Sequence, residues 1–241
     1  MGLKEPGLRG SLRNVSVGID AIPDSAIHQW AFDEGSGSTA TDSAGDNDLS
    51  ISGASWVSNG FEGGFALDFD GTDDNATGSF ISQLTGDNEF SFAFTVDLDN
   101  SSKGSEGTTE QVIYNADEDG SFENTFTCSV GNDSSDAFEF ESRDSNGDIA
   151  FRSGIDVSGE SGLARLTITH DGSGNSTVYL NGSEVTDQNL NGNVENDSGF
   201  AIASDSKNDL YWDGRMDHPI AYDSELSSSE VQNDYDTQPW S

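Results

Sequence analysis

The sequence predicts an all-β protein that folds as a two-sheet β-sandwich of the jelly-roll type. Three observations lead to this prediction: short runs in which apolar and polar residues alternate, Asx-Gly pairs between these runs, and no helical periodicity before the last residues. Alternation with a period of two is typical of strands that bury one face. Asx-Gly pairs supply the positive φ angles that tight hairpins need.

The run 90–98 is the strongest strand signal, because apolar residues occupy every second position and are expected to face the core: Phe90, Phe92, Phe94, Val96 and Leu98. The same alternation recurs in residues 136–142, 165–170 and 176–182. Inward-facing residues of two sheets would fill a common core, and the outward positions would carry the acidic residues.

The stretch GGFALDFDGTDD (63–74) is predicted to be a strand end that runs into a hairpin. Leu67 and Phe69 are expected to face the core, with Asp68 and Asp70 on the other face. A calcium loop of the EF-hand type needs acids at its first, third and fifth positions before a glycine, whereas here a glycine follows the second acid directly. The stretch is therefore interpreted as a solvated loop.

Two features near the C-terminus depart from plain alternation. LSSSEVQNDY (226–235) predicts one or two helical turns, with Ser227 and Glu230 spaced as a capping box. Pro219 lies in a predicted strand, and its missing N–H predicts either an edge strand or a bulge at this point.

The chain is extremely acidic, with 45 Asp and Glu against 9 Lys and Arg and a formal net charge of −36. Its 14 Phe, 5 Tyr and 4 Trp stand in periodic runs, which argues against a disordered chain. Molar salt shortens the screening length to about 3 Å and removes the self-repulsion, so this composition is typical of an extreme halophile. Nucleic acid is excluded as a partner of the body, because phosphate contacts need many Lys and Arg.

Residues 1–24 are predicted to form a basic N-terminal arm, and residues 25–241 the sandwich domain. Residues 1–13 hold three basic residues and one acid, a net charge of +2. Such an arm suits docking onto another acidic protein, and a frayed terminus without a role is the alternative.

The sequence also bears on location and redox chemistry. No apolar run at the start fits a signal peptide, and no stretch is apolar enough to span a membrane. We therefore expect synthesis as a soluble product in the cytoplasm, without membrane insertion. Cys128 is the only cysteine, which excludes an intramolecular disulfide, and it is expected to pack as a small apolar residue.

Four segments, in order, carry a resemblance to a known family: HQWAFDEGSGSTATDSAGDNDLSISGASW, GGFALDFDGTDD, LARLTITHDGSGNSTVYLNGSEV and YWDGRMDHPIAYDSELSSSEVQNDY. Their succession over residues 26–236 resembles the laminin-G-like jelly-roll domains of the concanavalin A-like lectin/glucanase superfamily. Residues 99–124 match only loosely and are expected to be variable loops.

The resemblance implies a structural calcium ion held by side chains of the first and last motifs. Carried over by position, its ligands are Glu34, Asp42 and Asp217, with loop carbonyl groups completing the shell. The three histidines, His28, His170 and His218, show no metal-ligand spacing and are expected at the surface or at strand ends.

The glucanase branch of this superfamily raises an enzyme alternative. Its catalytic carboxylates lie on alternate positions of one strand, and here only Glu139, Glu141 and Asp144 approximate that pattern. The order of Glu and Asp differs from the glucanase motif, and no tryptophan is near to stack a sugar ring. These acids are interpreted as the wet face opposite Phe138 and Phe140, and no catalytic residue is assigned.

The N-terminal MGLKEPGLRGSLRNVSVGIDAIP resembles the leaders of proteins of haloarchaea and their tailed viruses. The predicted function is thus a non-enzymatic structural or recognition protein on the surface of a haloarchaeal virion, in a turret, decoration or tail fibre. Expected partners are other virion proteins through the arm, further copies in a homo-oligomer, and a host surface glycan or glycoprotein met by loops 99–124 and 185–198. The alternatives are a haloarchaeal cell-surface adhesin or carbohydrate-binding module, a purely structural decoration, and a glycoside hydrolase.

Overall fold

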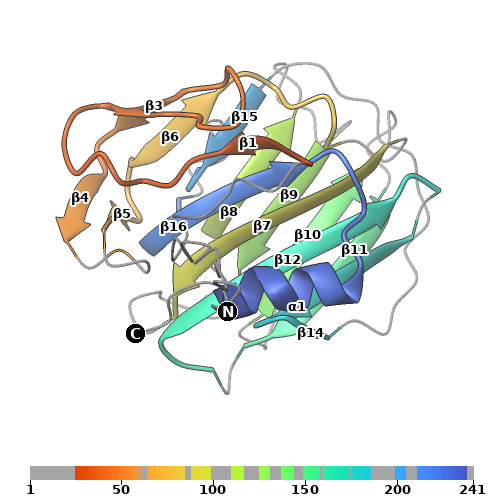
Figure 1. Ribbon diagram of the computed structural model, residues 1–241. Helices are drawn as coiled ribbons and strands as arrows, with labels where there is room; N and C mark the ends of the chain where they lie inside the picture. Colours follow the sequence, from red (N-terminus) through yellow and green to blue (C-terminus); the bar gives the residue numbers. More distant parts are fainter. Residues whose placement is uncertain are drawn as a thin grey trace, which may run out of the picture.

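The predicted sandwich is confirmed by a computed structural model, in which two antiparallel sheets stack face to face and one helix lies outside them (Figure 1). The structure describes residues 25–58, 60, 64–84, 88–98, 110–116, 125–130, 137–143, 149–157, 160–173, 175–185, 199–204 and 211–237. The expected arm, residues 1–24, lies outside the described residues. So does most of the expected contact loops 99–124 and 185–198.

The first sheet, called here the β7 sheet, has one central run of strands with β1 added to it. Its order is β14 (Ser183–Glu184), β13 (Ser176–Leu180), β12 (Leu163–Asp171), β7 (Glu89–Asp97), β16 (Asp213–Tyr222), β5 (Phe65–Asp70) and β4 (Ser55–Ser58), and β1 (Ala26–Gln29) pairs with β16. The Asn-Gly turn between β13 and β14 has positive φ at both residues, as its sequence predicts.

The second sheet, called here the β8 sheet, lies behind the first in Figure 1. Its order is β11 (Ile149–Asp156), β10 (Ala137–Arg143), β9 (Thr125–Val130), β8 (Glu110–Ala116), β15 (Gly199–Ile202), β6 (Asn75–Gly78), β3 (Leu49–Ser52) and β2 (Thr39–Ala40). The consecutive strands from β8 to β11 form a meander of antiparallel neighbours.

The main core lies between the two sheets, and the alternating runs supply it as predicted. All five apolar residues of run 90–98 are at most 2% exposed. From the β8 sheet, Phe138, Phe140 and the thiol-bearing Cys128 join the same cluster. The prediction that Cys128 packs as an apolar residue is therefore confirmed.

A second, smaller core lies on the outer face of the β7 sheet, beneath helix α1 (Ser228–Thr237) (Figure 1). Its members are Ala93, Tyr179, Ile220, Tyr222, Leu226 and Val231. The capping box is confirmed, because Glu230 accepts a hydrogen bond from the Ser227 backbone N–H and the Glu230 N–H donates to the Ser227 hydroxyl. The outward acid Asp97 on the same face of β7 is also buried, and it pairs with Arg215 of β16.

Three expectations from the sequence were wrong or incomplete. The turn after β5 is no hairpin: β5 belongs to the β7 sheet and β6 to the β8 sheet, so residues 71–74 cross between the layers. Residues 99–124, expected as loops, contain strand β8. Pro219 lies in an interior strand, and of the two expectations for it only the bulge is confirmed, by the register shift between Asp217 and Ile220.

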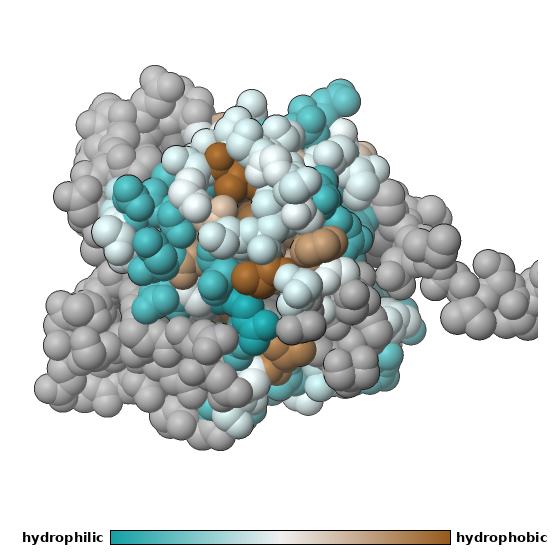
Figure 2. Space-filling view, turned by 90° about the vertical axis from the view of Figure 1, so that its left-hand side faces the viewer, coloured by the Kyte–Doolittle hydropathy of each residue, from teal (hydrophilic) through white to brown (hydrophobic). Residues whose placement is uncertain are grey.

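The surface of the described part is polar, in keeping with the composition. The side formed by β3 to β6 shows mainly hydrophilic and neutral residues, with small and separated hydrophobic areas (Figure 2). Among the described residues, Val185 is the one large hydrophobic side chain that is exposed. Within the same ranges, no helix has the length and apolar character needed to cross a membrane.

Candidate functional site

The three predicted calcium ligands lie in different surroundings. Glu34 is exposed, and its carboxylate accepts a hydrogen bond of 2.7 Å from the backbone N–H of Thr41. Asp42 is buried and forms an isolated β-bridge with Trp30, whereas Asp217 is buried within β16. Among the described residues, these three carboxylates do not form a group whose oxygens lie within 4.8 Å of one another.

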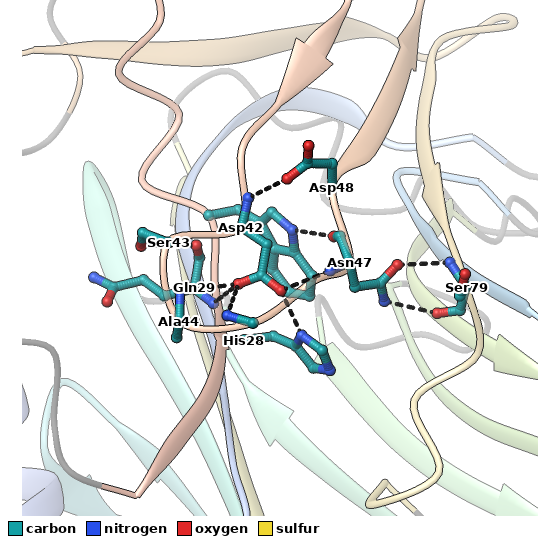
Figure 3. A network of polar contacts seen from close by, with 10 residues as sticks. His28, Gln29, Asp42, Ser43, Ala44, Asn47, Asp48 and Ser79 are labelled. Carbon is teal, nitrogen blue, oxygen red and sulfur yellow. Dashed lines mark hydrogen bonds and ion pairs between the residues drawn. The ribbon is translucent and has the colours of Figure 1, made fainter.

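Asp42 is the centre of a dense hydrogen-bond network at the start of the sandwich (Figure 3). Its Oδ1 accepts the backbone N–H groups of Gln29, Ala44 and Gly45 at 2.9–3.1 Å. Its Oδ2 accepts the N–H of Asn47 at 3.0 Å and lies 2.6 Å from His28 Nδ1. Five N–H groups thus surround one carboxylate, and it fastens the loop 42–48 to β1.

This environment favours the ionised form of Asp42. Burial acts to raise its pKa, but the hydrogen bonds from His28 and from the backbone N–H groups of Gln29, Asn47 and Gly45 outweigh burial, so the pKa lies below its ordinary value. Both oxygens of this carboxylate already accept hydrogen bonds from N–H groups. A calcium ion bound to Asp42 would have to displace some of these donors. The calcium site at Glu34, Asp42 and Asp217 stays a prediction.

Asn47 ties the same loop to the rest of the sandwich. Its backbone carbonyl accepts the indole N–H of Trp30 at 2.8 Å. Its side-chain amide exchanges two hydrogen bonds with the backbone of Ser79, at 2.7 and 2.8 Å (Figure 3). The network around Asp42 and Asn47 therefore joins β1, the loop 42–48 and the segment after β6. Its role is structural.

A different group of acids does come together, in the crossing between β5 and β6. One carboxylate oxygen each of Asp70, Asp73 and Asp74 lies within 4.8 Å of the others, and among the described residues this is the one such group. Asp70 and Asp73 are exposed, whereas Asp74 is buried and its Oδ2 accepts the N–H of Asp70 at 2.9 Å. The sequence interpretation compared this stretch with the EF-hand alone and did not foresee the gathering; four acids within seven residues were the available signal.

The electrostatics of this group are unfavourable without a counter-ion. Burial raises the pKa of Asp74; the N–H of Asp70 lowers it, and the charges of Asp70, Asp73 and Asp68 raise it further. Oxygen ligands of this kind suit hard cations such as Ca²⁺. The turn 70–74 is therefore a second candidate calcium site beside the predicted one at Glu34, Asp42 and Asp217. An experiment has to distinguish between these two sites.

Removal of divalent cations tests the calcium prediction. If calcium saturates its site a hundredfold above Kd, it adds about 2.7 kcal/mol, so a chelator at fixed ionic strength should lower Tm by roughly 5–10 °C in a domain of this size. Loss of this shift in Glu34→Gln, with the shift kept in Asp73→Asn, would place the ion at the predicted residues. The reverse pattern would place it at the turn, and an unchanged Tm in the parent chain would remove both.

The outer face of the β8 sheet forms a second candidate site, because no described helix covers it. Its half-buried side chains alternate with the buried Phe138 and Phe140. Hydroxyl groups and carboxylates face each other across neighbouring strands, in the pairs Thr127–Glu141, Ser129–Glu139 and Ser50–Thr77. Such groups donate and accept hydrogen bonds in several directions, as ligands rich in hydroxyl groups require.

Glu139 and Glu141 lie on this outer face, which confirms their interpretation as the wet side of β10. Asp144, the third acid of the glucanase-like pattern, lies outside the described residues. A retaining glycosidase needs two carboxyl groups about 5–5.5 Å apart with a nucleophile and an acid in distinct environments. In this strand Glu139 and Glu141 are both half-buried, and the enzyme alternative is left to the experiment given below.

Comparison with known proteins now decides the family. The family model described as "Concanavalin A-like lectin/glucanases superfamily" matches residues 69–232. The chain belongs to this superfamily. The fold and the laminin-G-like resemblance read from the sequence are thereby confirmed, whereas no curated protein sequence matches the chain.

Solved structures similar to this superfamily member include binding domains of botulinum neurotoxins. The domain described as "botulinum neurotoxin serotype D binding domain" has a TM-score of 0.69 at 16% identity, over 89% of this chain and 52% of that chain. The binding domain of Paraclostridial Mosquitocidal Protein 1 gives 0.68 at 15%, over 88% and 52%. A serotype D ligand-binding domain in complex with N-acetylneuraminic acid gives 0.68 at 16%, over 89% and 51%.

These similarities support the fold alone. The chain spans about half the length of the toxin domains that it matches. Identity of this order leaves the side chains of a binding site free to differ, so the ligand of one relative cannot be assigned to this superfamily member by position.

Proposed function

We propose that the chain is a non-enzymatic recognition protein on the surface of a haloarchaeal virion and that it binds glycans of the host cell surface. Membership of a superfamily of lectins and glucanases supports the carbohydrate ligand. The net charge of −36 and the leader-like N-terminus support a halophilic, viral setting. Two similar botulinum neurotoxin domains, of serotypes C/D and D, are named as receptor-binding domains, so this fold serves recognition in other proteins.

The observation that carries this proposal is the outer face of the β8 sheet. Half-buried hydroxyl groups and carboxylates pair across β9 and β10, and two hydroxyl groups pair across β3 and β6, at positions fixed by the sheet. A rigid sheet holds such groups at a constant spacing, which lowers the ordering cost of binding a sugar chain. Each site would be weak, and many copies on one particle would raise the total affinity.

A blocking variant tests the proposed binding face. Thr127→Arg places a long charged side chain in the middle of the face, and we expect at least a tenfold loss of binding to glycans from haloarchaeal envelopes in molar salt, because bound sugar would lose contact with the sheet. Ser55→Arg is the matched control, since Ser55 is exposed on β4 of the other sheet. Equal binding by both variants, with unchanged Tm, would move the glycan site away from this face.

The same assay can also test whether the chain cleaves the glycans. A glycosidase would release reducing ends from the envelope glycans, and Glu139→Gln or Glu141→Gln would stop that release. We expect no release by the parent chain. Turnover that either variant abolishes would replace the binding proposal by the glucanase alternative.

The virion setting and the arm are further parts of this proposal. Residues 1–24 would attach the domain to another virion protein, and the sandwich would face outward. Mass spectrometry of purified haloviral particles should detect the chain at many copies per particle. Detection in host envelopes alone would favour the adhesin alternative.

A further inference from the structure

Among the described residues, one tryptophan reaches the surface. Trp30 and Trp212 are fully buried in the main core, whereas Trp56 on β4 is half-buried. β4 is the last strand of the β7 sheet, and it lies at the side of the sandwich that Figure 2 shows. Trp56 therefore offers aromatic surface to a ligand at the edge of the sheet.

The indole ring of Trp56 is held in place by the fold. It packs against the main core and meets the ring of Phe32 edge to face, with 6.4 Å between the ring centroids. Its Nε1–H donates a hydrogen bond of 2.9 Å to the carbonyl of Gly37. Because the ring is already fixed, a ligand that stacks on it loses little free energy to the ordering of this side chain.

A second half-buried aromatic residue, Phe65 on β5, lies close to Trp56. Trp56 pairs with Leu67, a core residue, and Phe65 precedes Leu67 by two positions on the same side of the strand. Trp56 and Phe65 are therefore diagonal neighbours, a spacing that aromatic side chains can bridge. The loop 33–38 passes both rings, and the Phe65 ring is so close to Gly35 that a Cβ there would lie 2.5–2.7 Å from it.

Polar groups of the loop 33–38 flank the two rings. The carboxylate of Asp33 lies against the backbone of Gly64, the residue before Phe65, and Ser36 is exposed between the two glycines that contact the rings. Carboxylate and hydroxyl oxygens accept hydrogen bonds from the hydroxyl groups of a sugar. Aromatic surface with a few polar groups beside it is the usual composition of a small-molecule site.

We propose that Trp56, Phe65 and the loop 33–38 bind one neutral pyranose ring. The apolar CH groups on one face of the sugar stack on the indole ring, and its hydroxyl groups bond to Asp33 and Ser36. This inference rests on the proposed function as a glycan-binding protein, and it adds a site apart from the outer face of the β8 sheet.

The charge of the loop selects among sugars. Asp33 and Glu34 are both exposed, in a chain of net charge −36, so the carboxylate of a sugar acid would meet like charges. Such repulsion discriminates against an anionic ligand even where the contacts with the ring are the same. A single pyranose ring makes few contacts, and its Kd is expected at about 1 mM.

An NMR titration in molar salt tests the site. Methyl glucoside and methyl galactoside are the neutral probes, and the indole N–H signal of Trp56 is assigned by its absence in Trp56→Phe. At least one probe should shift this signal and leave those of the buried Trp30 and Trp212 in place. Glucuronate should bind more weakly than the neutral probe, and equal binding would overturn the assignment to neutral sugars.

A blocking variant locates the bound sugar. Ser36→Arg places a long charged side chain beside both rings, and we expect it to abolish the shift of the Trp56 signal. Ser173→Arg, the same change at an exposed turn after β12, is the matched control and should keep the shift. A Trp56 signal that neither probe moves, or equal titration of Ser36→Arg and the parent chain, would overturn the inference.

Thr127→Arg separates this inference from the proposed function. The variant should keep the shift of Trp56, because Thr127 lies in the β8 sheet and Trp56 in the β7 sheet. If envelope glycans bind and Thr127→Arg abolishes that binding while the Trp56 signal never moves, the edge site is wrong and the proposed function stands. If the parent chain binds no envelope glycan, the proposed function itself fails.

Discussion

Replacement of Asp234 by alanine is expected to lower the free energy of unfolding by about 3–5 kcal/mol, because it removes a carboxylate that is bonded to a buried guanidinium group. Arg165 is 1% exposed, and its Nε donates to Asp234 Oδ2 at 3.0 Å. The same guanidinium group donates to the carbonyl of His218 at 2.8 Å and to the hydroxyl of Thr95 at 3.2 Å. One side chain thus joins β12, β7 and β16 to helix α1.

Chemical denaturation at constant molar salt measures this effect. Asp236→Ala is the matched control: it removes the same charge from the same helix at an exposed position, and a change of at most about 0.5 kcal/mol is expected. The double variant Arg165→Met with Asp234→Leu should regain most of the loss, because apolar residues of similar volume replace buried ion pairs at little cost. Equal stability of the Asp234 and Asp236 variants would mean that α1 does not depend on this ion pair.

Tyr222 makes a second contact between β16 and Asp234 of helix α1. Its hydroxyl donates to Asp234 Oδ1 at 3.4 Å. Burial, and after it the charge of Asp234, raises the pKa of the Tyr222 phenol well above its usual range. The phenol is therefore neutral at neutral pH, and its hydrogen bond holds the end of β16 against α1.

The sequence predicts the main core well because alternation is a local property. The five apolar positions of run 90–98 and the pair Phe138 and Phe140 are all buried, as period-two alternation requires. The capping box at Ser227 and the Asn-Gly turn after β13 are equally local, since each depends on residues within four positions. Local chemistry of this kind can be read from a single chain.

The other face of β7 shows where this reasoning ends. Ser91, Thr95 and Asp97 alternate with the core residues and suggest a wet face, yet each is at most 2% exposed. Their partners come from distant parts of the chain: the backbone of Ser224 and Leu226 for Ser91, Arg165 for Thr95 and Arg215 for Asp97. The crossing of residues 71–74 between the sheets is missed for the same reason, because a hairpin and a crossing have similar turn residues and differ in long-range pairing.

The candidate sites follow the same division. Alternation predicts that Glu139 and Glu141 point away from the core, and in the structure they do. His218 was expected at the surface or at a strand end, but it lies buried in the middle of β16, where its Nε2 is 2.6 Å from Gln29 Nε2. The partner of this histidine is 189 residues away in sequence, and no spacing rule reaches so far.

Asp42 is the residue whose role the sequence left most open. The resemblance implies a metal ligand, whereas in the structure five N–H groups from β1 and from its own loop surround the carboxylate. A carboxylate with several backbone N–H partners resists protonation, which is why its pKa is lowered in spite of burial. The role of such a residue depends on which groups the fold directs toward it.

Asp42→Asn is expected to lower the free energy of unfolding by about 2–4 kcal/mol. The amide presents an NH₂ group where a carboxylate oxygen now accepts, so two buried donors lose their acceptor at about 1–3 kcal/mol each. The effect is measured by denaturation at neutral pH in molar salt. Asp46→Asn, at an exposed position of the same loop, is the matched control and should change stability by at most about 0.5 kcal/mol.

The pH dependence of this variant separates the charge of Asp42 from its shape. Because the folded pKa of Asp42 is depressed, its contribution is fully present above the ordinary Asp pKa of about 3.9 and is lost as pH falls through the folded value. The difference in stability between the parent chain and Asp42→Asn should therefore shrink in acid and remain constant from pH 5 to neutrality. A difference that stays unchanged down to pH 2 would mean that packing, and not the ionised carboxylate, fastens the loop 42–48 to β1.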